Sequence, residues 1–188
     1  MTKRIGLTTG AGAAPDGAAL WRFSLAFYAC PGVAEALLAL QDCRGLDVNL
    51  ILFGLWLGLS GRPPLTGTAL AAADRAIDPL RAEIVEPLRR LRRRLKPSGD
   101  SDVQRLRDGV KAIELAAEEA IQHRLAAGAG PTAETDPAAC LVGAYANLAL
   151  CLGREAGRSA EATAIRDALK AFACTASELR TAPRRHPL

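Results

Sequence analysis

Aromatic residues are scarce in this chain: Phe, Trp and Tyr make up 4% of its 188 residues, although 49% of the residues are hydrophobic. Alanine and leucine supply most of the apolar content, and both favour helices over strands. The shortage of aromatic and β-branched residues therefore argues against a β-rich fold and predicts an all-α protein. A chain of this length forms one domain. We expect a disordered leader over residues 1–16, a single helical domain over residues 17–178, and a disordered tail over residues 179–188.

Metal ligands and long apolar runs are also few. There are two histidines, and the five cysteines form no CxxC pair; such an odd set fits reduced thiols better than disulfides or a zinc site. The longest stretch without a polar side chain, residues 50–59, is shorter than the roughly 17 to 25 residues that cross a bilayer. We therefore predict a cytoplasmic protein with no metal, no cofactor and no catalytic residue, and favour a non-catalytic role over an enzymatic one.

Proline, glycine and capping residues divide the chain into about eight helices. Pro79 is expected to open the fifth of them, and Pro87 to kink or divide it near Val85, because proline removes a hydrogen bond and crowds the preceding turn. The pattern predicts a helical bundle with helices over residues 18–28, 31–44, 48–60, 66–77, 80–96 and 102–127, and two more that begin near residues 137 and 159.

The third predicted helix is apolar on every side, which indicates a buried, central position rather than a surface one. Within it, Gly54 and Gly58 form a GxxxG pair, whose spacing lets another backbone approach closely. Either the pair is simply buried within the domain, or it forms the interface of a homodimer. Trp56 lies between the two glycines in the sequence and is expected to fill the core beside them or to line a pocket.

A polar motif, QDCRGLDVN over residues 41–49, precedes this apolar helix. Its turn has a local explanation: Gly45 takes the left-handed conformation after the second helix, Asp47 caps the third helix, and Leu46 and Ile51 form a hydrophobic staple. The turn does not account for three polar residues of the motif. These are Gln41, Asp42 and Asn49.

These unexplained side chains have two interpretations. Carboxylates beside an apolar helix can have raised pKa values and act as acid or base, or bind a ligand. Buried polar groups can equally be hydrogen-bonded parts of the architecture, and we favour that interpretation. As an alternative function we predict an enzyme or small-molecule-binding protein with a candidate pocket formed by Trp21, Gln41, Asp42, Asp47, Asn49 and Trp56.

Positive charge is concentrated in LRRLRRRLKP, residues 88–97, which contains six cations and no carboxylate. The short KPSGDS connection predicts an antiparallel hairpin of the fifth and sixth helices. Apolar positions from Val103 to Ala120, including Leu106 and Ile113, have the spacing of a short coiled-coil seam. The candidate partner-binding cations of this basic hairpin are Arg89, Arg90, Arg92, Arg93, Arg94, Lys96, Arg105 and Arg107.

A localised basic surface attracts anionic partners. An acidic protein surface is the favoured partner; a nucleic acid is less favoured because no aromatic side chains interleave the arginines to stack on bases, and an anionic membrane surface is also less favoured. A merely solvated helix face is the remaining alternative. The leading functional prediction is a non-catalytic adaptor or regulatory protein that docks through this hairpin.

Several short patterns occur together between residues 20 and 122: Trp-x-Phe-Ser from Trp21, Tyr-x-x-x-Gly-Val from Tyr28, the motif at residues 41–49, and Pro-Leu-Arg from Pro87. In this order they resemble a family of small uncharacterised proteobacterial proteins, domain of unknown function 2390. The resemblance implies no activity. It supports the boundaries of the helical domain and draws attention to the polar motif and the basic hairpin.

Overall fold

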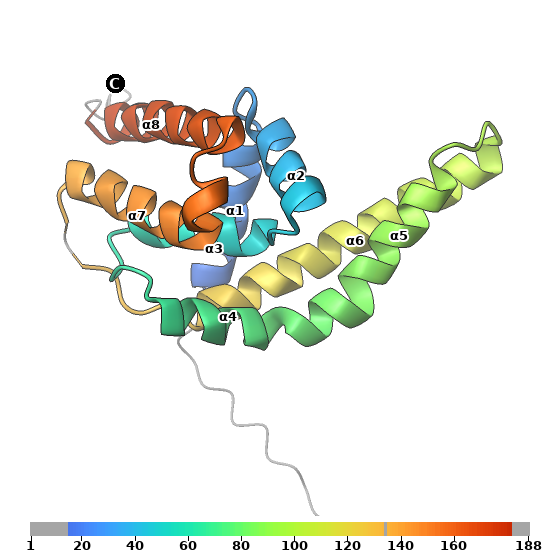
Figure 1. Ribbon diagram of the computed structural model, residues 1–188, viewed down its shortest axis with the longest axis horizontal. Coiled ribbons are helices and arrows are strands. Elements are labelled where there is room, and N and C mark those ends of the chain that lie inside the picture. Colours follow the sequence, from blue (N-terminus) through green and yellow to red (C-terminus); the bar gives the residue numbers. More distant parts are fainter. Residues whose placement is uncertain (1–14, 134, 182–188) are drawn as a thin grey trace, which may run out of the picture.

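The computed structural model describes residues 15–133 and 135–181 (Figure 1). Over these residues the chain forms eight α-helices and one π-helical segment, with no strand, which confirms the predicted all-α fold. In chain order they are α1 (Pro15–Tyr28), α2 (Val33–Arg44), α3 (Val48–Leu59), α4 (Gly67–Leu80), η1 (Arg81–Val85), α5 (Glu86–Leu95), α6 (Ser101–Ala127), α7 (Pro137–Ala156) and α8 (Ala160–Thr181).

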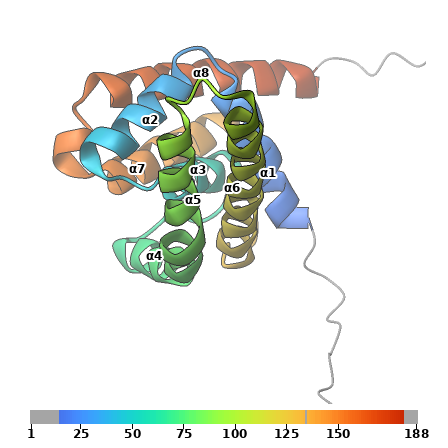
Figure 2. The same cartoon turned by 90° about the vertical axis from the view of Figure 1, so that its right-hand side faces the viewer.

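Helix α3 is the centre of the molecule, as its uniformly apolar sequence predicts. Ten of its twelve residues are buried. One side packs into a core with α1, α2, α7 and α8, around Phe27, Leu55 and Leu148. The other side packs into a second core with α4 and α6, around Trp56 and Ile121. The figures show α3 enclosed by the other helices of the body (Figures 1 and 2).

The GxxxG pair of α3 faces α7 of the same chain. A Cβ atom added at Gly58 would lie 2.2 Å from the backbone nitrogen of Ala144, and one at Gly54 would lie 3.1 Å from Sγ of Cys151. Asn147 reinforces the contact, since its Nδ2 donates a hydrogen bond of 2.9 Å to the carbonyl of Gly54. Of the two alternatives for this pair, burial within the domain is the one that the structure shows, because the glycine face is covered by α7 of the same chain; the homodimer stays a prediction.

The basic helix is reached through one continuous helical arm. Pro79 lies inside α4 rather than opening a new helix, which corrects that boundary. The predicted division near Val85 is confirmed: the π-helical segment η1 ends there, with the N–H of Glu86 bonded to the carbonyl of Arg81, and α5 follows with Pro87 in its first turn. Pro87 has no N–H group, and it lies in a first turn, where a helix does not use that N–H for an internal hydrogen bond.

Helices α5 and α6 form the predicted antiparallel hairpin, which extends beyond the body of the molecule (Figure 1); the two helices lie side by side (Figure 2). The predicted seam is only partly right. Leu106 and Ile113 are 64% and 58% exposed, whereas Glu114 is only 6% exposed. The face of α6 that packs against α5 is therefore not the apolar one that the heptad spacing predicts. It carries carboxylates that bind the arginines of α5.

The ends of the described chain refine the domain boundaries. Helix α1 begins at Pro15, inside the predicted leader, and α8 continues to Thr181, inside the predicted tail; the rest of those two predictions, for residues 1–14 and 182–188, lies outside the described residues. Within the described residues, α7 is long and apolar enough to cross a membrane, a test that core helices of soluble proteins also pass. The cytoplasmic location stays a prediction.

Candidate functional site

The turn between α2 and α3 has the local structure that its sequence predicts. Gly45 is left-handed with φ 66°, and its N–H bonds to the carbonyl of Gln41. The N–H of Leu46 returns to the carbonyl of Leu40 at 3.4 Å. Oδ1 of Asp47 accepts hydrogen bonds from the backbone nitrogens of Asn49 and Leu50 at 2.8 and 3.3 Å. The cap is confirmed, and it uses only one oxygen of the Asp47 carboxylate.

The second oxygen of Asp47 binds a residue that sequence reasoning did not single out. Nη1 of Arg81 lies 3.1 Å from Oδ2 of Asp47 and also binds Asp74, while its Nη2 lies 2.7 Å from Asp78. Burial alone would lower the pKa of Arg81, but the hydrogen bonds that its guanidinium donates to the three carboxylates outweigh burial and raise the pKa. This cluster fixes the polar motif to the root of the helical arm.

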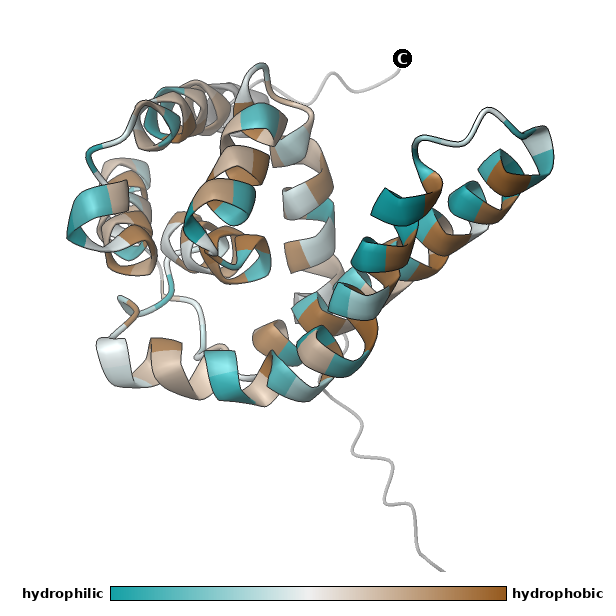
Figure 3. Cartoon of the chain, turned by 45° about the vertical axis from the view of Figure 1, so that its right-hand side comes forward, coloured by the Kyte–Doolittle hydropathy of each residue, from teal (hydrophilic) through white to brown (hydrophobic). Residues whose placement is uncertain are grey.

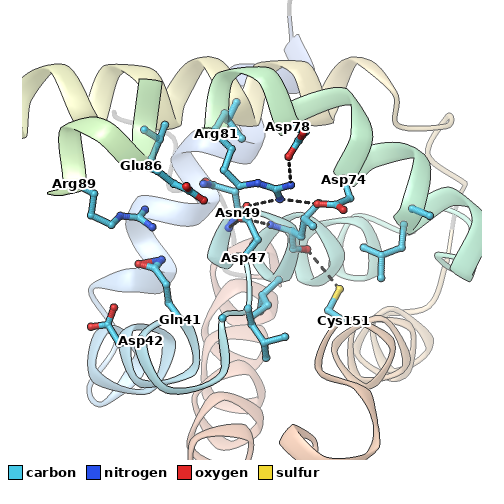
Figure 4. Close-up of a pocket in the computed structure, with 18 of the residues that line it drawn as sticks. Gln41, Asp42, Asp47, Asn49, Asp74, Asp78, Arg81, Glu86, Arg89 and Cys151 are labelled. Carbon is cyan, nitrogen blue, oxygen red and sulfur yellow. Dashed lines mark hydrogen bonds and ion pairs between the residues drawn. The ribbon is translucent and has the colours of Figure 1, made fainter. Parts of the chain in front are cut away.

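A pocket of about 850 Å³ opens between the polar motif and the arm; it is called the larger pocket below. Figure 4 shows Gln41 and Asp42 on one wall, Glu86 and Arg89 on the wall opposite, and the Arg81 cluster toward the far end. Nη2 of Arg93 spans the two walls and binds Oδ1 of Asp42 at 2.9 Å. The polar motif and the basic helix, which are separate in the sequence, are thus two sides of one cavity.

Cys151 of α7 also lines the larger pocket, but it is not suited to nucleophilic chemistry. Burial raises the pKa of its thiol to about 12, and Sγ donates to the carbonyl of Leu50 at 3.5 Å. Because the thiolate is the reactive form, this cysteine stays a protonated, unreactive group at neutral pH.

A second cavity of about 360 Å³, the smaller pocket, lies between α1, α2, α3 and the hairpin. Gln41, Asn49 and Arg89 line both pockets. Along the smaller pocket runs a buried hydrogen-bonded chain: the hydroxyl of Ser24 donates to Gln122 at 2.8 Å, and Gln122 donates to Asn49 at 3.0 Å. The amide of Asn49, which the turn did not explain, is therefore partly architectural.

The predicted pocket residues divide among three places. Four of them lie together in the larger pocket: Gln41, Asp42, Asp47 and Asn49. Trp21 lines the smaller pocket instead. Trp56 lines neither pocket, which corrects its assignment: it is 5% exposed and packs in the core with the guanidinium of Arg62 4.1 Å from its ring centroid.

Most of the hairpin cations form ion pairs within the chain, although the basic run in the sequence contains no carboxylate. Arg89 lies 2.8 Å from Glu118, and Arg92 binds Glu114. A hydrogen bond to Glu114 raises the pKa of Arg92, and burial raises the pKa of Glu118 against the opposing effect of Arg89. Ion pairs also hold Arg90, Arg93 and Arg105.

Three of the eight cations have no ion pair to another described residue: Arg94, Lys96 and Arg107, all near the tip of the hairpin. Arg94 and Lys96 are exposed and Arg107 is partly buried. Of the eight predicted cations, those without an ion pair therefore lie near the tip, while those nearer the body are bound to carboxylates of the chain. Among the described residues, no group of three or more His, Cys, Asp and Glu side chains is placed to hold a metal ion.

Together, the central apolar helix, the capped polar turn and the arginine-rich hairpin define an all-α protein with adjoining polar and apolar pockets. The chain belongs to a family described as "Protein of unknown function (DUF2390)", whose sequence model matches residues 19–125. That segment runs from α1 almost to the end of α6, so it contains both walls of the larger pocket. No protein with a curated description and no solved structure matches the chain.

Proposed function

We propose that the protein binds a small polar molecule in the larger pocket. One observation supports this function best: the polar turn at residues 41–49 and the basic helix α5 face each other across that cavity, and both lie in the family segment. Its volume of about 850 Å³ lies within the range of about 300 to 1,000 Å³ that is usual for ligand sites. Binding, rather than catalysis, is the proposed activity.

The walls of the larger pocket suit a ligand that carries both positive and negative groups. The carboxylates of Asp74 and Asp78, which bind Arg81, line this pocket, and so do the guanidinium groups of Arg90 and Arg93. The side chain of Gln41 has no hydrogen-bond partner among the described residues, so its amide can both donate to and accept from a ligand.

The exchangeable part of the site is the pair that spans the pocket. Asp42 and Arg93 are 53% and 56% exposed, and an ion pair this exposed adds at most about 1 kcal/mol to stability. A ligand can therefore replace either partner at little cost to the fold.

Asp42→Asn is expected to abolish ligand binding while it changes the free energy of unfolding by less than about 1 kcal/mol. To measure binding, the purified protein is incubated with a small-molecule extract of cells, and the compounds that it retains are identified by mass spectrometry. The control is Asp102→Asn, which makes the same chemical change in the exposed Arg105–Asp102 pair. Equal retention of a compound by wild type and Asp42→Asn would contradict the proposal, and a large loss of melting temperature would assign Asp42 to the architecture.

As a second function we propose docking on an acidic protein surface through the tip of the hairpin. Support comes from Arg94 and Lys96, which are exposed and have no ion pair to another described residue, and from Leu91 and Leu106 nearby, which are 43% and 64% exposed. Figure 3 shows hydrophobic and hydrophilic positions side by side along the protruding helices. Such a surface matches a partner with carboxylates around an apolar contact.

The triple variant Arg94→Glu, Lys96→Glu and Arg105→Glu is expected to lose a bound acidic protein in a pull-down at low salt, where charge contacts are strongest. The matched control reverses three exposed cations away from the tip, Arg75, Arg124 and Lys170. Far-ultraviolet circular dichroism should show equal helicity in both. If the triple variant loses a nucleic acid or anionic vesicles instead of a protein, the partner is of that class and the acidic protein is rejected. Unchanged retention would refute docking at the tip.

A further inference from the structure

The smaller pocket gathers exposed apolar side chains from three helices. Leu25 of α1, Leu38 of α2 and Leu115 of α6 are 49%, 47% and 47% exposed, and all three line this cavity together with Trp21. Single exposed leucines are common on protein surfaces. Here they converge around one concavity, beside polar and charged side chains that also line it, and an apolar wall with polar groups next to it is the arrangement of a binding site for an amphipathic molecule.

Polar groups in the smaller pocket still have hydrogen-bonding capacity. Burial raises the pKa of Tyr28 to about 12, so its hydroxyl stays protonated, and it has no hydrogen-bond partner among the described residues. In the Ser24–Gln122–Asn49 chain, Oδ1 of Asn49 accepts from Gln122, while its Nδ2 has no partner among the described residues. Both groups line the pocket and can donate to a ligand oxygen.

The charges around the smaller pocket leave one cation unbalanced. Three cationic side chains and two carboxylates line it. Arg89 and Arg92 are bound by Glu114 and Glu118. Lys111 is exposed and has no ion pair to another described residue, so the pocket combines an apolar surface with one available positive charge.

We propose that the smaller pocket binds an aliphatic carboxylic acid. The hydrocarbon part lies against Trp21, Leu25, Leu38 and Leu115, and the carboxylate pairs with Lys111. The volume of about 360 Å³ is near the lower end of the usual range for ligand sites, which favours a medium-length chain over a long one. This inference does not depend on the function proposed for the larger pocket, because the ligand and the residues that select it differ.

Octanoate is the probe for this proposal, with octanol and octylamine as neutral and cationic controls. The chain has two tryptophans; Trp21 lines the pocket and Trp56 is buried in the core. We expect octanoate to change the tryptophan emission of the wild type in a saturable manner. The change should disappear in Trp21→Phe, which leaves Trp56 as the only tryptophan, while calorimetry still detects binding to that variant.

Two pairs of variants test the apolar wall and the charge. Leu115→Asp is expected to abolish octanoate binding, whereas Leu106→Asp, an exposed leucine of the same helix outside the pocket, should bind as the wild type does. Lys111→Glu should weaken binding about tenfold, since reversing one nearby charge in water changes the interaction by that order, and Lys170→Glu should leave it unchanged. Both Lys111 and Lys170 are exposed, so the charge test keeps the fold.

The proposal is overturned if octanoate shows no saturable binding, if octanol or octylamine binds as tightly as octanoate, or if Leu106→Asp loses as much affinity as Leu115→Asp. Asp42→Asn should bind octanoate like the wild type. If the polar-ligand proposal fails, the octanoate result therefore still stands. If octanoate does not bind, the carboxylic-acid site is rejected, and the proposal for the larger pocket is not affected.

Discussion

Gly58→Ala is expected to lower the free energy of unfolding by about 3 kcal/mol or more, the upper part of the range for overpacked sites. The new Cβ would lie 2.2 Å from the backbone nitrogen and 2.3 Å from the Cα of Ala144. These are backbone atoms of α7, so no side-chain rotation can make room, and α3 and α7 must move apart. Their separation would also stretch the hydrogen bonds of Asn147, which joins α7 to Gly54 and to the backbone nitrogen of Leu65.

Urea unfolding followed by circular dichroism measures this loss, and Gly67→Ala provides the control. A Cβ atom at Gly67 meets nothing within 4 Å, and the same change in a helix reduces the freedom of the unfolded chain, so we expect a neutral effect or a gain of up to about 1 kcal/mol. If the free energy of unfolding of Gly58→Ala lies within about 0.5 kcal/mol of the wild-type value, α3 and α7 do not pack backbone to backbone in solution.

The α2–α3 turn illustrates what the sequence can predict. Gly45, Leu46 and Asp47 act on residues within a few positions of themselves, through a left-handed glycine, a returning N–H and a capping carboxylate. Such interactions depend on local backbone geometry, which residue type largely decides. The central position of α3 was predictable for a related reason, because a helix without a polar face has to be covered.

The larger pocket illustrates what the sequence could not supply. Its ion pairs join Asp42 to Arg93 and Asp47 to Arg81, over 51 and 34 positions of the chain. Which carboxylate meets which arginine depends on how far the helical arm turns at η1, and no local pattern specifies that angle. The predicted apolar seam of α6 was partly wrong for the same reason. Glu114, rather than Ile113, lies on the inward face, because the arginines of α5 lie opposite.

Glu114→Gln is expected to be the second most damaging single change, with a loss of about 3 kcal/mol in the free energy of unfolding, as for other buried ion pairs that lose one partner. The Glu114 side chain is 8% exposed and binds both Arg89 and Arg92, which are 18% and 27% exposed. Removing the carboxylate charge leaves two half-buried guanidinium groups with Glu118 as the nearest compensation. Thermal and urea unfolding measure the loss, and Asp102→Asn, on the same helix in a pair that is 79% and 75% exposed, should change stability by less than about 1 kcal/mol.

The same variant should also change how the hairpin meets anions. Glu114 now neutralises cations that would otherwise extend the basic tip toward the body, so Glu114→Gln is expected to raise affinity for a polyanion such as heparin, with a steeper dependence on salt. Asp102→Asn should raise it less, because its partner Arg105 is already exposed to solvent. If Glu114→Gln loses stability without gaining heparin affinity, the buried pairs have only a structural role. A gain would instead indicate that these pairs restrict the exposed charge, and hence the docking surface, to the tip.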